Sequence, residues 1–394
     1  MAEPVDLIEI FEFRRPSDDS YMGTLDDRDV ALGQYHFVRR FNGTVYPTAD
    51  RSVVIRIVDA NGAEGWGETY GLVAPKIVAE LVGELFGPLL GARAPENPSD
   101  FWDAAYALQR NRGYWGGYLA DTLAALDIAL WDLHARRRCE SLQASLGRAG
   151  AGRLPCYVSG LAGASTAQRV EMGREWQCRG FDSVKIPVSA TDNGDVVGEI
   201  AALRAGLGAD QRIALDLHWT LTASETLALD RALVPHRPWF LEAPTVPEDI
   251  AAQRGIADKA VHSIALGEEW RTEWDYRTRL ECCRIVQPEM GHSGITQFMR
   301  IAALANRQGA QIIPHATIGL GIFMAASVRA SLAAGASSHE FQHTIYHRNG
   351  ALLDGIATCE AGAFDIPETT GHGVRPNAQA FELMTQIGIW RRAR

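Results

Sequence analysis

The chain has 394 residues, 46% of them hydrophobic and 22% charged, which is an ordinary globular composition with enough apolar material for a large core. Lys and Arg total 38 against 48 Asp and Glu, so the net charge of −10 has the wrong sign for a general binder of nucleic acid or anionic membranes. We expect no secretory signal, because the amino end carries Glu3, Asp6 and Glu9 and has no basic region followed by an apolar run. We expect no membrane helix, because no apolar stretch reaches about 18 residues. The six cysteines have no CxxC spacing, which favours free thiols in a reducing cytoplasm.

The amino-terminal part of the chain has the pattern of an antiparallel sheet. Residues 5–13 and 52–60 alternate in polarity or are rich in β-branched side chains, and the Asn61-Gly62 pair that follows is typical of a hairpin turn. The polar stretch from Arg14 to Asp29 is too long and too charged for a tight turn. We therefore expect a mobile loop between the two strands.

Helical periodicity follows this sheet. From Pro75 onward apolar residues recur at intervals of three and four, most clearly over residues 119–135. Together the two patterns predict an α+β domain over residues 1–145.

Eight short β-like runs then alternate with helical segments. This alternation implies βα crossovers and a parallel sheet, and eight units within about 190 residues suit a closed (β/α)8 barrel of the α/β class. We assign the barrel to residues 146–350, and we expect the Gly- and Pro-rich tail, residues 351–394, to pack back on the first domain. The strand candidates lie near residues 156, 183, 213, 239, 263, 284, 311 and 338.

Seven of these candidate strands end in a polar or ionisable residue. From the second of them onward the steps are 26, 26, 21, 26 and 25 residues, close to one βα unit each. In a barrel this spacing places all of them around the mouth where active sites of the fold lie. One polar strand end is commonly just solvated, but seven in register indicate a site. The seven residues are Lys185, Asp216, Glu242, Glu268, Glu289, His315 and Glu340.

Three of the seven, Asp216, Glu242 and Glu268, come from consecutive strands. Three carboxylates at short range repel one another unless a cation neutralises them, and hard oxygen ligands favour Mg²⁺. Salt bridges with arginines are the alternative. We expect one Mg²⁺ per subunit at this point of the mouth.

The order of these features resembles that of the enolase superfamily, in its mandelate racemase and muconate lactonising group. The resemblance rests on the Gly-Trp-Gly-Glu run at 65–68, the Leu-Asp-Ile-Ala-Leu-Trp-Asp helix at 126–132, and the strand lysine and carboxylates named above. It covers essentially the whole chain and implies a capping domain on a modified TIM barrel. It also implies a Mg²⁺ that holds a substrate carboxylate, removal of the proton α to it, and an enediolate intermediate. The 14–29 loop is then expected to close over the mouth, with Tyr21 binding substrate.

The resemblance also indicates which bases are present. Racemases of this group carry Lys-x-Lys on the second strand, whereas Pro187 here takes the place of the second lysine, so a base on that face is missing. Lys185 is then expected to bind the substrate carboxylate. His315 and Glu289 come from adjacent strands, and a carboxylate beside an imidazole fixes its tautomer and gives a base poised near neutral pH. Most relatives have aspartate where Glu289 stands, which leaves the geometry of this pair open.

His218 lies two residues beyond Asp216, and residues i and i+2 of a strand face the same side. We therefore expect it beside the metal. This Asp-x-His resembles the galactonate dehydratase branch, in which the histidine gives a proton to the departing β-hydroxyl. Packing on Trp219 without chemistry is the alternative. Glu340 resembles the last-strand glutamate that donates a hydrogen bond to the substrate carboxylate, which requires a protonated side chain and is favoured by burial.

The sequence thus predicts a Mg²⁺-dependent dehydratase that converts an aldonate or aldarate to a 2-keto-3-deoxy acid. His315 would take the α-proton, the metal and Glu340 would hold the enediolate, and His218 would protonate the leaving hydroxyl. The alternatives are a cycloisomerase or epimerase acting on a sugar acid or lactone, and a binding or regulatory protein that kept the fold without turnover. We expect a cytoplasmic homo-oligomer with a small acid sugar as its partner, and no nucleic acid or membrane partner.

Overall fold

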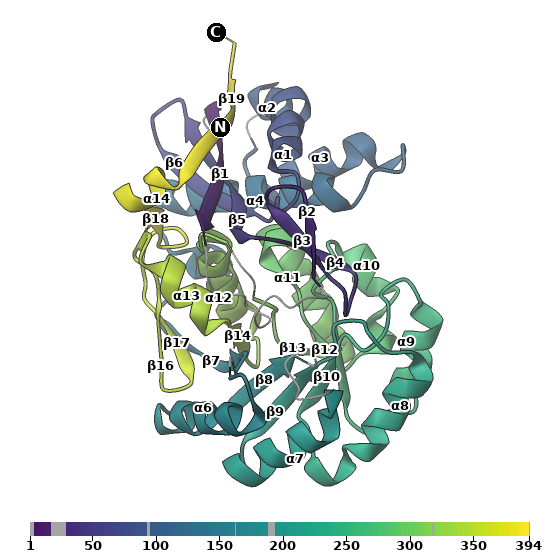
Figure 1. The fold of residues 1–394 in the computed structure, drawn as a ribbon. Helices are drawn as coiled ribbons and strands as arrows, with labels where there is room; N and C mark the ends of the chain where they lie inside the picture. Colours follow the sequence, from purple (N-terminus) through teal and green to yellow (C-terminus); the bar gives the residue numbers. More distant parts are fainter. Residues whose placement is uncertain are drawn as a thin grey trace.

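The computed structural model describes residues 4–16, 29–92, 95–161, 163–187, 194–316 and 319–393. Two bodies lie one above the other: a smaller sheet-and-helix body at the top, called the cap below, and a larger barrel at the bottom (Figure 1). Within the described residues no helix is both long and apolar enough to cross a membrane. All six cysteines are free thiols, as expected.

The cap is built on a four-stranded antiparallel sheet with the order β19-β1-β5-β6. Its first strand alternates between the core and the outer face, because side chains of a strand point to opposite sides. The expected hairpin between β5 and β6 is confirmed, and Gly62 takes the φ of +83° that such a turn needs. The four strands are β1 (Val5–Pro16), β5 (Ala49–Asp59), β6 (Glu64–Thr69) and β19 (Met384–Arg391).

A second, three-stranded sheet lies between β1 and β5 in the chain, after the expected 14–29 loop and in residues for which we predicted no element. Its strands pair antiparallel in chain order and lie beside the barrel mouth (Figure 1). They are β2 (Val30–Leu32), β3 (His36–Arg39) and β4 (Thr44–Pro47). Most of the 14–29 loop, including Tyr21, lies outside the described residues.

The helices of the cap pack on one side of its main sheet. Strand β6 approaches the longest helix so closely that a Cβ on Gly65 or Gly67 would lie 2.1 or 2.0 Å from a backbone oxygen of that helix. These two positions therefore require glycine, which explains two letters of the Gly-Trp-Gly-Glu run. The helical segments are α1 (Pro75–Leu81), a π-helical turn (Val82–Phe86), α2 (Gly87–Ala92), α3 (Pro98–Arg110) and α4 (Gly117–Arg137).

The barrel contains all eight strands that the sequence predicts. Seven follow one another as parallel neighbours, and the eighth pairs with the first. The ring closes through two backbone hydrogen bonds, from Ser337 to Ile312 (3.0 Å) and from Glu340 to Pro314 (3.3 Å). The strands are β7 (Gly152–Ser159), β8 (Ser183–Pro187), β9 (Arg212–Asp216), β10 (Phe240–Glu242), β11 (Ser263–Leu266), β12 (Ile285–Val286), β13 (Gln311–Ile312) and β14 (His339–Phe341).

A helix follows each barrel strand, as in a (β/α)8 fold. These helices are α6 (Thr166–Cys178), α7 (Val196–Leu207), α8 (Ala223–Ala232), α9 (Ile250–Ala257), α10 (Glu273–Arg277), α11 (Met290–Gln308), α12 (Ile322–Ala334) and α13 (His343–Gly350). Shorter helical pieces are α5 (Leu142–Ser145) and the 3₁₀ turns Val234–His236 and Leu280–Cys282.

The carboxy-terminal tail contacts both bodies. Strand β17 pairs antiparallel with barrel strand β7, and β19 adds an edge strand to the cap sheet. The tail thereby runs up the left side of the molecule in Figure 1. Its other elements are β15 (Leu353–Asp354), β16 (Thr358–Glu360), β17 (Ala363–Ile366), β18 (Arg375–Pro376) and α14 (Ala378–Glu382).

Three buried acids of the two quoted motifs join the cap to the rest of the chain. Glu68 accepts hydrogen bonds of 2.5–3.2 Å from the backbone N–H groups at the start of α12, where the helix dipole favours a carboxylate. Asp127 accepts from the backbone and the hydroxyl of Thr296, at 2.7 and 2.6 Å. Asp132 accepts from the backbone N–H groups of Trp66 and His372. The motifs therefore position the two bodies, and they contribute no group to the mouth through these acids.

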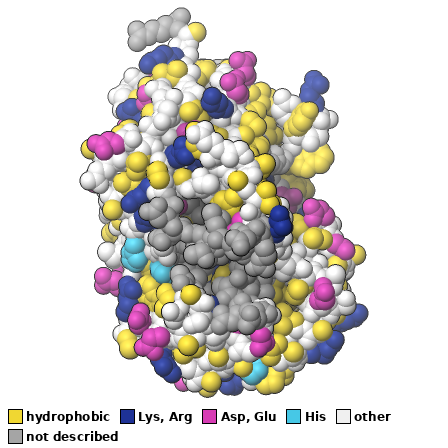
Figure 2. Space-filling model, in the orientation of Figure 1, with side chains coloured by type: hydrophobic (Ala, Val, Ile, Leu, Met, Phe, Trp, Pro, Cys, Tyr) yellow, Lys and Arg dark blue, Asp and Glu magenta, His cyan; other side chains and the backbone are white. Residues whose placement is uncertain are grey.

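Charges of both signs are interspersed over the coloured part of the face in Figure 2, with apolar side chains between them. This mixture agrees with the modest negative net charge of the chain. The site described next lies in the zone where the cap meets the barrel.

Candidate active site

The seven predicted residues lie at the carboxyl ends of the barrel strands. Asp216 and Glu242 are the last residues of β9 and β10 and face each other in register. Lys185 and Glu340 lie within β8 and β14, and the remaining three follow β11, β12 and β13 by two or three residues. The fold therefore brings all seven to one end of the barrel.

Lys185 is buried between two carboxylates. Its Nζ lies 2.5 Å from Oε1 of Glu242 and 3.0 Å from Oε1 of Glu340. Burial alone would lower the pKa of Lys185, but these two carboxylates raise it well above its ordinary value, so the ammonium is charged. The second oxygen of Glu242 accepts a 2.6 Å hydrogen bond from Gln287.

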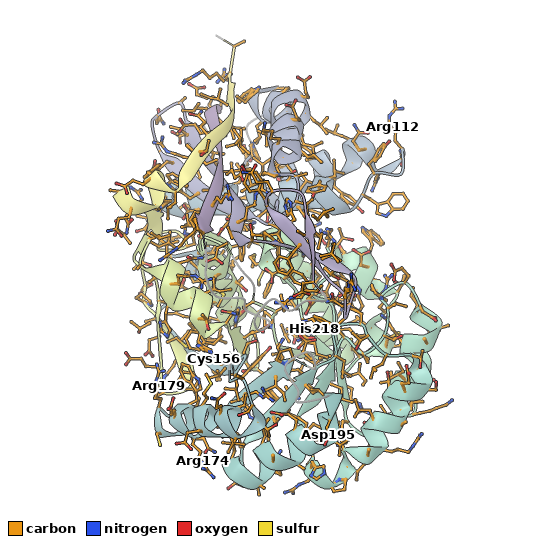
Figure 3. All side chains as sticks on the ribbon, in the orientation of Figure 1. Arg112, Cys156, Arg174, Arg179, Asp195 and His218 are labelled. Atoms are coloured by element: carbon orange, nitrogen blue, oxygen red, sulfur yellow. The ribbon has the colours of Figure 1, made fainter. Side chains whose placement is uncertain are left out.

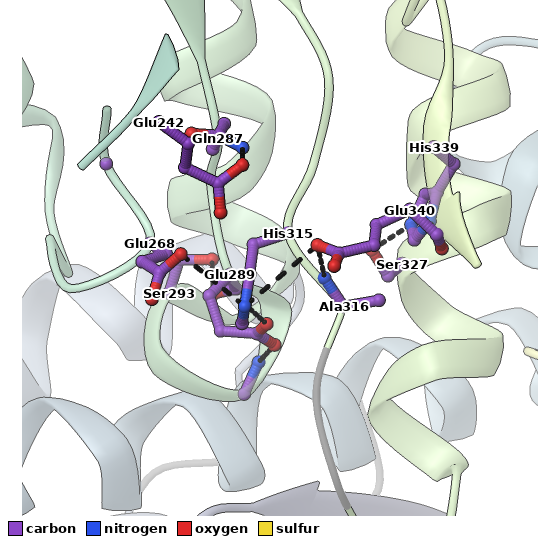
Figure 4. A network of polar contacts seen from close by, with 12 residues as sticks. Glu242, Glu268, Gln287, Glu289, Ser293, His315, Ala316, Ser327, His339 and Glu340 are labelled. Atoms are coloured by element: carbon purple, nitrogen blue, oxygen red, sulfur yellow. Dashed lines mark hydrogen bonds and ion pairs between the residues drawn. The ribbon is translucent and has the colours of Figure 1, made fainter. Parts of the chain in front are cut away.

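His315 forms the expected pair with Glu289, whose Oε2 lies 2.8 Å from Nδ1 (Figure 4). The other oxygen of Glu289 accepts from the backbone N–H of Gly291 at 2.9 Å, so the carboxylate is fixed and the longer side chain reaches the imidazole. Nε2 of His315 lies 3.5 Å from Glu268 and 4.0 Å from Glu340.

The resting protonation of His315 differs from the expectation of a base poised near neutrality. Burial alone would lower its pKa, but the carboxylates of Glu268, Glu340 and Glu289 together raise it to about 10. The imidazole is therefore protonated at neutral pH in this structure. The physical reason is that three carboxylates face the ring, where the sequence indicated one.

Glu340 is also in the opposite state from the one that we expected. Burial raises its pKa, but Lys185 and His315 outweigh burial and lower it to about 2. Its Oε2 accepts a 3.1 Å hydrogen bond from the backbone N–H of Ala316. The side chain is therefore an ionised acceptor that holds two cations, and the expected protonated donor is wrong for this structure.

His218 lies beside Asp216, but not for the reason that the sequence suggested. Strand β9 ends at Asp216, and His218 and Trp219 have φ of +47° and +56°, so strand alternation does not orient them. The resulting turn places Nε2 of His218 3.2 Å from Oδ2 of Asp216, and the His218 backbone N–H donates to Oδ1 at 3.0 Å. Burial and the nearby Lys185 lower the pKa of His218 to about 4, so the ring is neutral. Its buried Nδ1 has no hydrogen-bond partner among the described residues.

The carboxylates of Asp216, Glu242 and Glu268 offer oxygen donors of the kind that Mg²⁺ binds. Burial is the main cause that raises the pKa of each, and mutual repulsion adds to it at Glu242 and Glu268. Oε2 of Glu268 is buried without a hydrogen-bond donor from the described residues. This excess of buried negative charge fits a divalent cation. In the conformation described, however, no three Asp, Glu, His or Cys side chains of the described residues converge as metal ligands, and the two oxygens of Glu242 contact Lys185 and Gln287.

A cavity of about 440 Å³ opens between this end of the barrel and the cap. Figure 3 shows His218 at the top of the barrel, below β4. The cavity is lined by residues of β4, the segment after β6, the start of α4 and the strand ends of the barrel. They are Thr44, Val45, Tyr46, Pro47, Tyr70, Gly71, Leu72, Val73, Gly117, Tyr118, Asp121, His218, Trp219, Glu268, Glu269, Arg271, His292, His315, Ala316 and Gln342.

Two family models match this chain and together span most of it. Residues 43–147 match the mandelate racemase / muconate lactonizing enzyme N-terminal domain, and residues 167–380 match the enolase C-terminal domain-like family. The chain belongs to the enolase superfamily.

Individual relatives agree with this membership. A D-galactonate dehydratase from Ralstonia nicotianae is 29% identical over 350 residues, which cover 84% of this chain and 90% of the relative. A D-galactarolactone cycloisomerase from Agrobacterium fabrum is also 29% identical, over 346 residues covering 83% and 89%. The crystal structure of an enolase superfamily member from Agrobacterium tumefaciens is 44% identical, with a TM-score of 0.94 over 98% of this chain and 100% of that one.

The cavity of the present protein also contains a residue that the sequence analysis did not identify, Tyr46. The hydroxyl of Tyr46 accepts a 3.0 Å hydrogen bond from Asn42, and burial raises the pKa of Tyr46 to about 12, with a further contribution from Asp216 and Glu268. The hydroxyl therefore lies near the acidic end of the cavity. No pattern in residues 30–47 marked it, because the three short strands there were not predicted.

The predicted substrate-binding loop is described only at its edges. Tyr21 lies outside the described residues. The guanidinium of Arg14 packs over the ring of Tyr35, with 3.9 Å to its centroid, and Arg15 hydrogen-bonds to Asn349 at 3.3 Å. Both arginines therefore contact other residues of this protein, Arg14 through the ring of Tyr35 and Arg15 through Asn349.

Proposed function

We propose that this superfamily member is a Mg²⁺-dependent acid sugar dehydratase, which converts an aldonate or aldarate to a 2-keto-3-deoxy acid. The observation that supports it is that His218 and His315 line one cavity, while Pro187 removes the second lysine that a two-base racemase needs. Elimination of water requires one base for the α-proton and one acid for the β-hydroxyl.

The proposed steps use residues whose positions are given above. Lys185 binds and orients the substrate carboxylate with its ammonium. His315, held through Nδ1 by Glu289, removes the α-proton at Nε2 in its neutral form, which a cation held by Glu268 would favour, since the charge of Glu268 is the main cause that raises the pKa of the ring. The substrate carboxylate at Lys185 offsets the positive charge that helps to lower the pKa of His218, so the ring can take up a proton. His218 delivers this proton to the β-hydroxyl, the C–O bond breaks and water leaves. The enol that remains then becomes the 2-keto acid.

In this proposal Asp216, Glu242 and Glu268 hold Mg²⁺. When bound, the ion supplies two positive charges that acidify the proton α to the substrate carboxylate and offset the repulsion among the three acids. In the conformation described Glu242 contacts Lys185, so Glu242 would have to rotate away from Lys185 to hold the ion together with Asp216 and Glu268.

A cycloisomerase acting on a sugar lactone is the second candidate. It is favoured by the D-galactarolactone cycloisomerase, which is as similar to this chain as the D-galactonate dehydratase is. Such a reaction also begins with removal of an α-proton by a single base, so the His315–Glu289 pair serves both candidates. The products differ, because only the dehydratase releases a 2-keto acid.

The test is a panel of aldonates, aldarates and their lactones, assayed with Mg²⁺ for 2-keto acid by semicarbazide and for α-proton exchange in D₂O by NMR. We expect one or more sugar acids to yield a 2-keto acid, with the activity lost in EDTA. His315→Asn should lower kcat by about 10²–10⁴-fold and abolish exchange, whereas His218→Asn should retain exchange but lose elimination.

Other results would support the alternatives. Turnover of a lactone or sugar acid without any 2-keto acid would indicate the cycloisomerase or epimerase. Thermal stabilisation by a sugar acid, with neither product nor exchange at any pH, would indicate a binding protein. The cytoplasmic location and the homo-oligomer stay predictions, to be checked by fractionation and by light scattering of the purified protein.

A further inference from the structure

A second carboxylate–imidazole pair lies in the same cavity as His315. Asp121, near the start of α4 in the cap, lies with its Oδ1 2.8 Å from Nδ1 of His292, in the first turn of α11. The ring of His292 stacks on Tyr70 with centroids 4.1 Å apart and planes within 8°. The ring is therefore held by two contacts, and its Nε2 has no partner among the described residues.

Arg271 completes this cluster. Its Nε and Nη2 donate to the two oxygens of Asp121 at 2.9 and 3.4 Å, and its Nη1 donates to the backbone oxygen of Glu269 at 2.9 Å. A guanidinium has five N–H groups, so one on each terminal nitrogen is left for a ligand. Asp121 is buried, and His292 and Arg271 lower its pKa despite that burial, so its charge is balanced within the cluster.

The cluster lies away from the group that binds the reacting carboxylate. Lys185 belongs to β8, whereas Arg271 follows β11, His292 follows β12, and Asp121 comes from the cap. His218 and His315 line the cavity together with these three. A substrate that reaches His218 and His315 therefore meets the cluster in the same cavity.

The charge of the cavity lining distinguishes two classes of sugar acid. Among the described lining residues Arg271 is the only arginine or lysine, and Asp121 already neutralises it. The carboxylate of Glu269 lines the same region. A second substrate carboxylate here would lie against Asp121 and near Glu269, whose pKa burial raises to about 7, and like charges without solvent between them oppose binding. A hydroxyl, in contrast, can donate to Asp121 and accept from Arg271 or His292.

We propose that Asp121, Arg271 and His292 form the subsite for the end of the substrate remote from its reacting carboxylate, and that this subsite accepts an uncharged, hydroxylated end. The substrate is then a monocarboxylate sugar acid and not a dicarboxylate. The inference rests on the proposed function, since it takes Lys185 as the anchor of the reacting carboxylate.

The experiment compares acids that share a carbon skeleton and differ in the charge of the far end. The pairs are D-galactonate with galactarate and D-gluconate with D-glucarate. We measure kcat and KM for 2-keto acid formation by the wild type, and Kd by calorimetry with Mg²⁺ for the His315→Asn variant, which reports binding without turnover. We expect the monoacid of at least one pair to be preferred by about tenfold or more.

Asp121→Asn keeps the size of the side chain and removes its charge. The ratio of diacid to monoacid, in kcat/KM and in 1/Kd, should rise by about tenfold or more, mainly through KM, because Arg271 becomes an unbalanced cation. His262→Gln is the matched control: it breaks a 2.7 Å contact between a histidine and Asp230, outside the cavity, and should leave the ratio unchanged.

A wild type that prefers the diacid, or an Asp121→Asn variant with an unchanged ratio, would overturn the inference. A third result is possible: the monoacid binds more tightly, the preference changes in Asp121→Asn, and no 2-keto acid forms. This result would support the subsite and reject the dehydratase. Binding of neither member of either pair would overturn the inference for these acids and count against the proposed function as well.

Discussion

Glu289 fixes the base of the proposed reaction with both of its oxygens. One contacts His315 and the other accepts from the backbone of Gly291, so the side chain can neither rotate nor shorten without losing a partner. Glu289→Gln should lower kcat by about 10²-fold or more, because an amide does not hold the imidazole in the required tautomer and charge state. Glu289→Asp, one methylene shorter, should lose part of that activity.

The measurement is kcat, KM and the pH profile of 2-keto acid formation for both variants, with the melting temperature as a control for folding. The KM should change little, since Glu289 is not placed at the substrate. Full kcat in Glu289→Gln with an unchanged pH profile would show that the pair is structural only.

The positions of the individual site residues could be predicted from the sequence, but their protonation could not. One βα unit of spacing places Asp216 and Glu242 at the same end of the barrel whatever the side chains contact. Whether Glu340 is ionised depends on which cations face it in space, and those lie far away in the chain. Asp121 gave no signal at all, because an acid within a helix is usually solvated.

Strand β6 and helix α4 form the tightest contact between elements that the sequence motifs explain. Gly67→Ala would place a Cβ 2.0 Å from the backbone oxygen of Ala125, so the two elements would have to separate. We expect the free energy of unfolding to fall by about 1–3 kcal/mol or more. Urea denaturation at a fixed pH measures this loss.

Gly255→Ala serves as the matched control for that substitution. Gly255 lies within α9, and a Cβ there would meet no atom within 4 Å. The change should stabilise the protein by about 0.5–1 kcal/mol, because alanine is the better helix former. Equal effects of the two substitutions would mean that the contact of β6 with α4 is not as close as described.

Helices and strands with a clear periodicity of hydrophobic residues were predicted from the sequence, and those without such a periodicity were missed. All eight barrel strands were found, although β12 and β13 are only two residues long, because their flanking helices frame them. The sheet of β2, β3 and β4 was missed because strands of three or four residues carry too few alternations to stand out. That omission hid Tyr46, which only the sheet brings to the cavity.

The molecule as a whole is held together where the cap, the barrel and the tail meet. His372, from the tail, has an exposed fraction of 0%, and its Nε2 lies 2.9 Å from the backbone oxygen of Trp66 in β6. Its Nδ1 accepts from the backbone N–H of Val374 at 3.4 Å. These two contacts together specify the neutral ring with the proton on Nε2, since a protonated ring has no lone pair for Val374.

This junction should make the stability of the whole molecule depend on pH. Burial lowers the pKa of His372 in the folded protein, whereas in the unfolded chain it is about 6.5. Above pH 6.5 both states are neutral and the contribution of the residue is fully present. Below pH 6.5 His372 is protonated in the unfolded chain but still neutral in the folded protein, so the free energy of unfolding falls as the pH falls.

The difference between wild type and His372→Gln isolates this contribution, because glutamine keeps hydrogen-bonding groups and does not titrate. We expect the wild type to exceed the variant in free energy of unfolding at pH 8, and the excess to shrink steadily between pH 6.5 and 5. Urea titrations at four pH values measure it. An excess that stays constant over this range would show that the pKa of His372 is the same in the folded and unfolded protein, and that burial does not lower it.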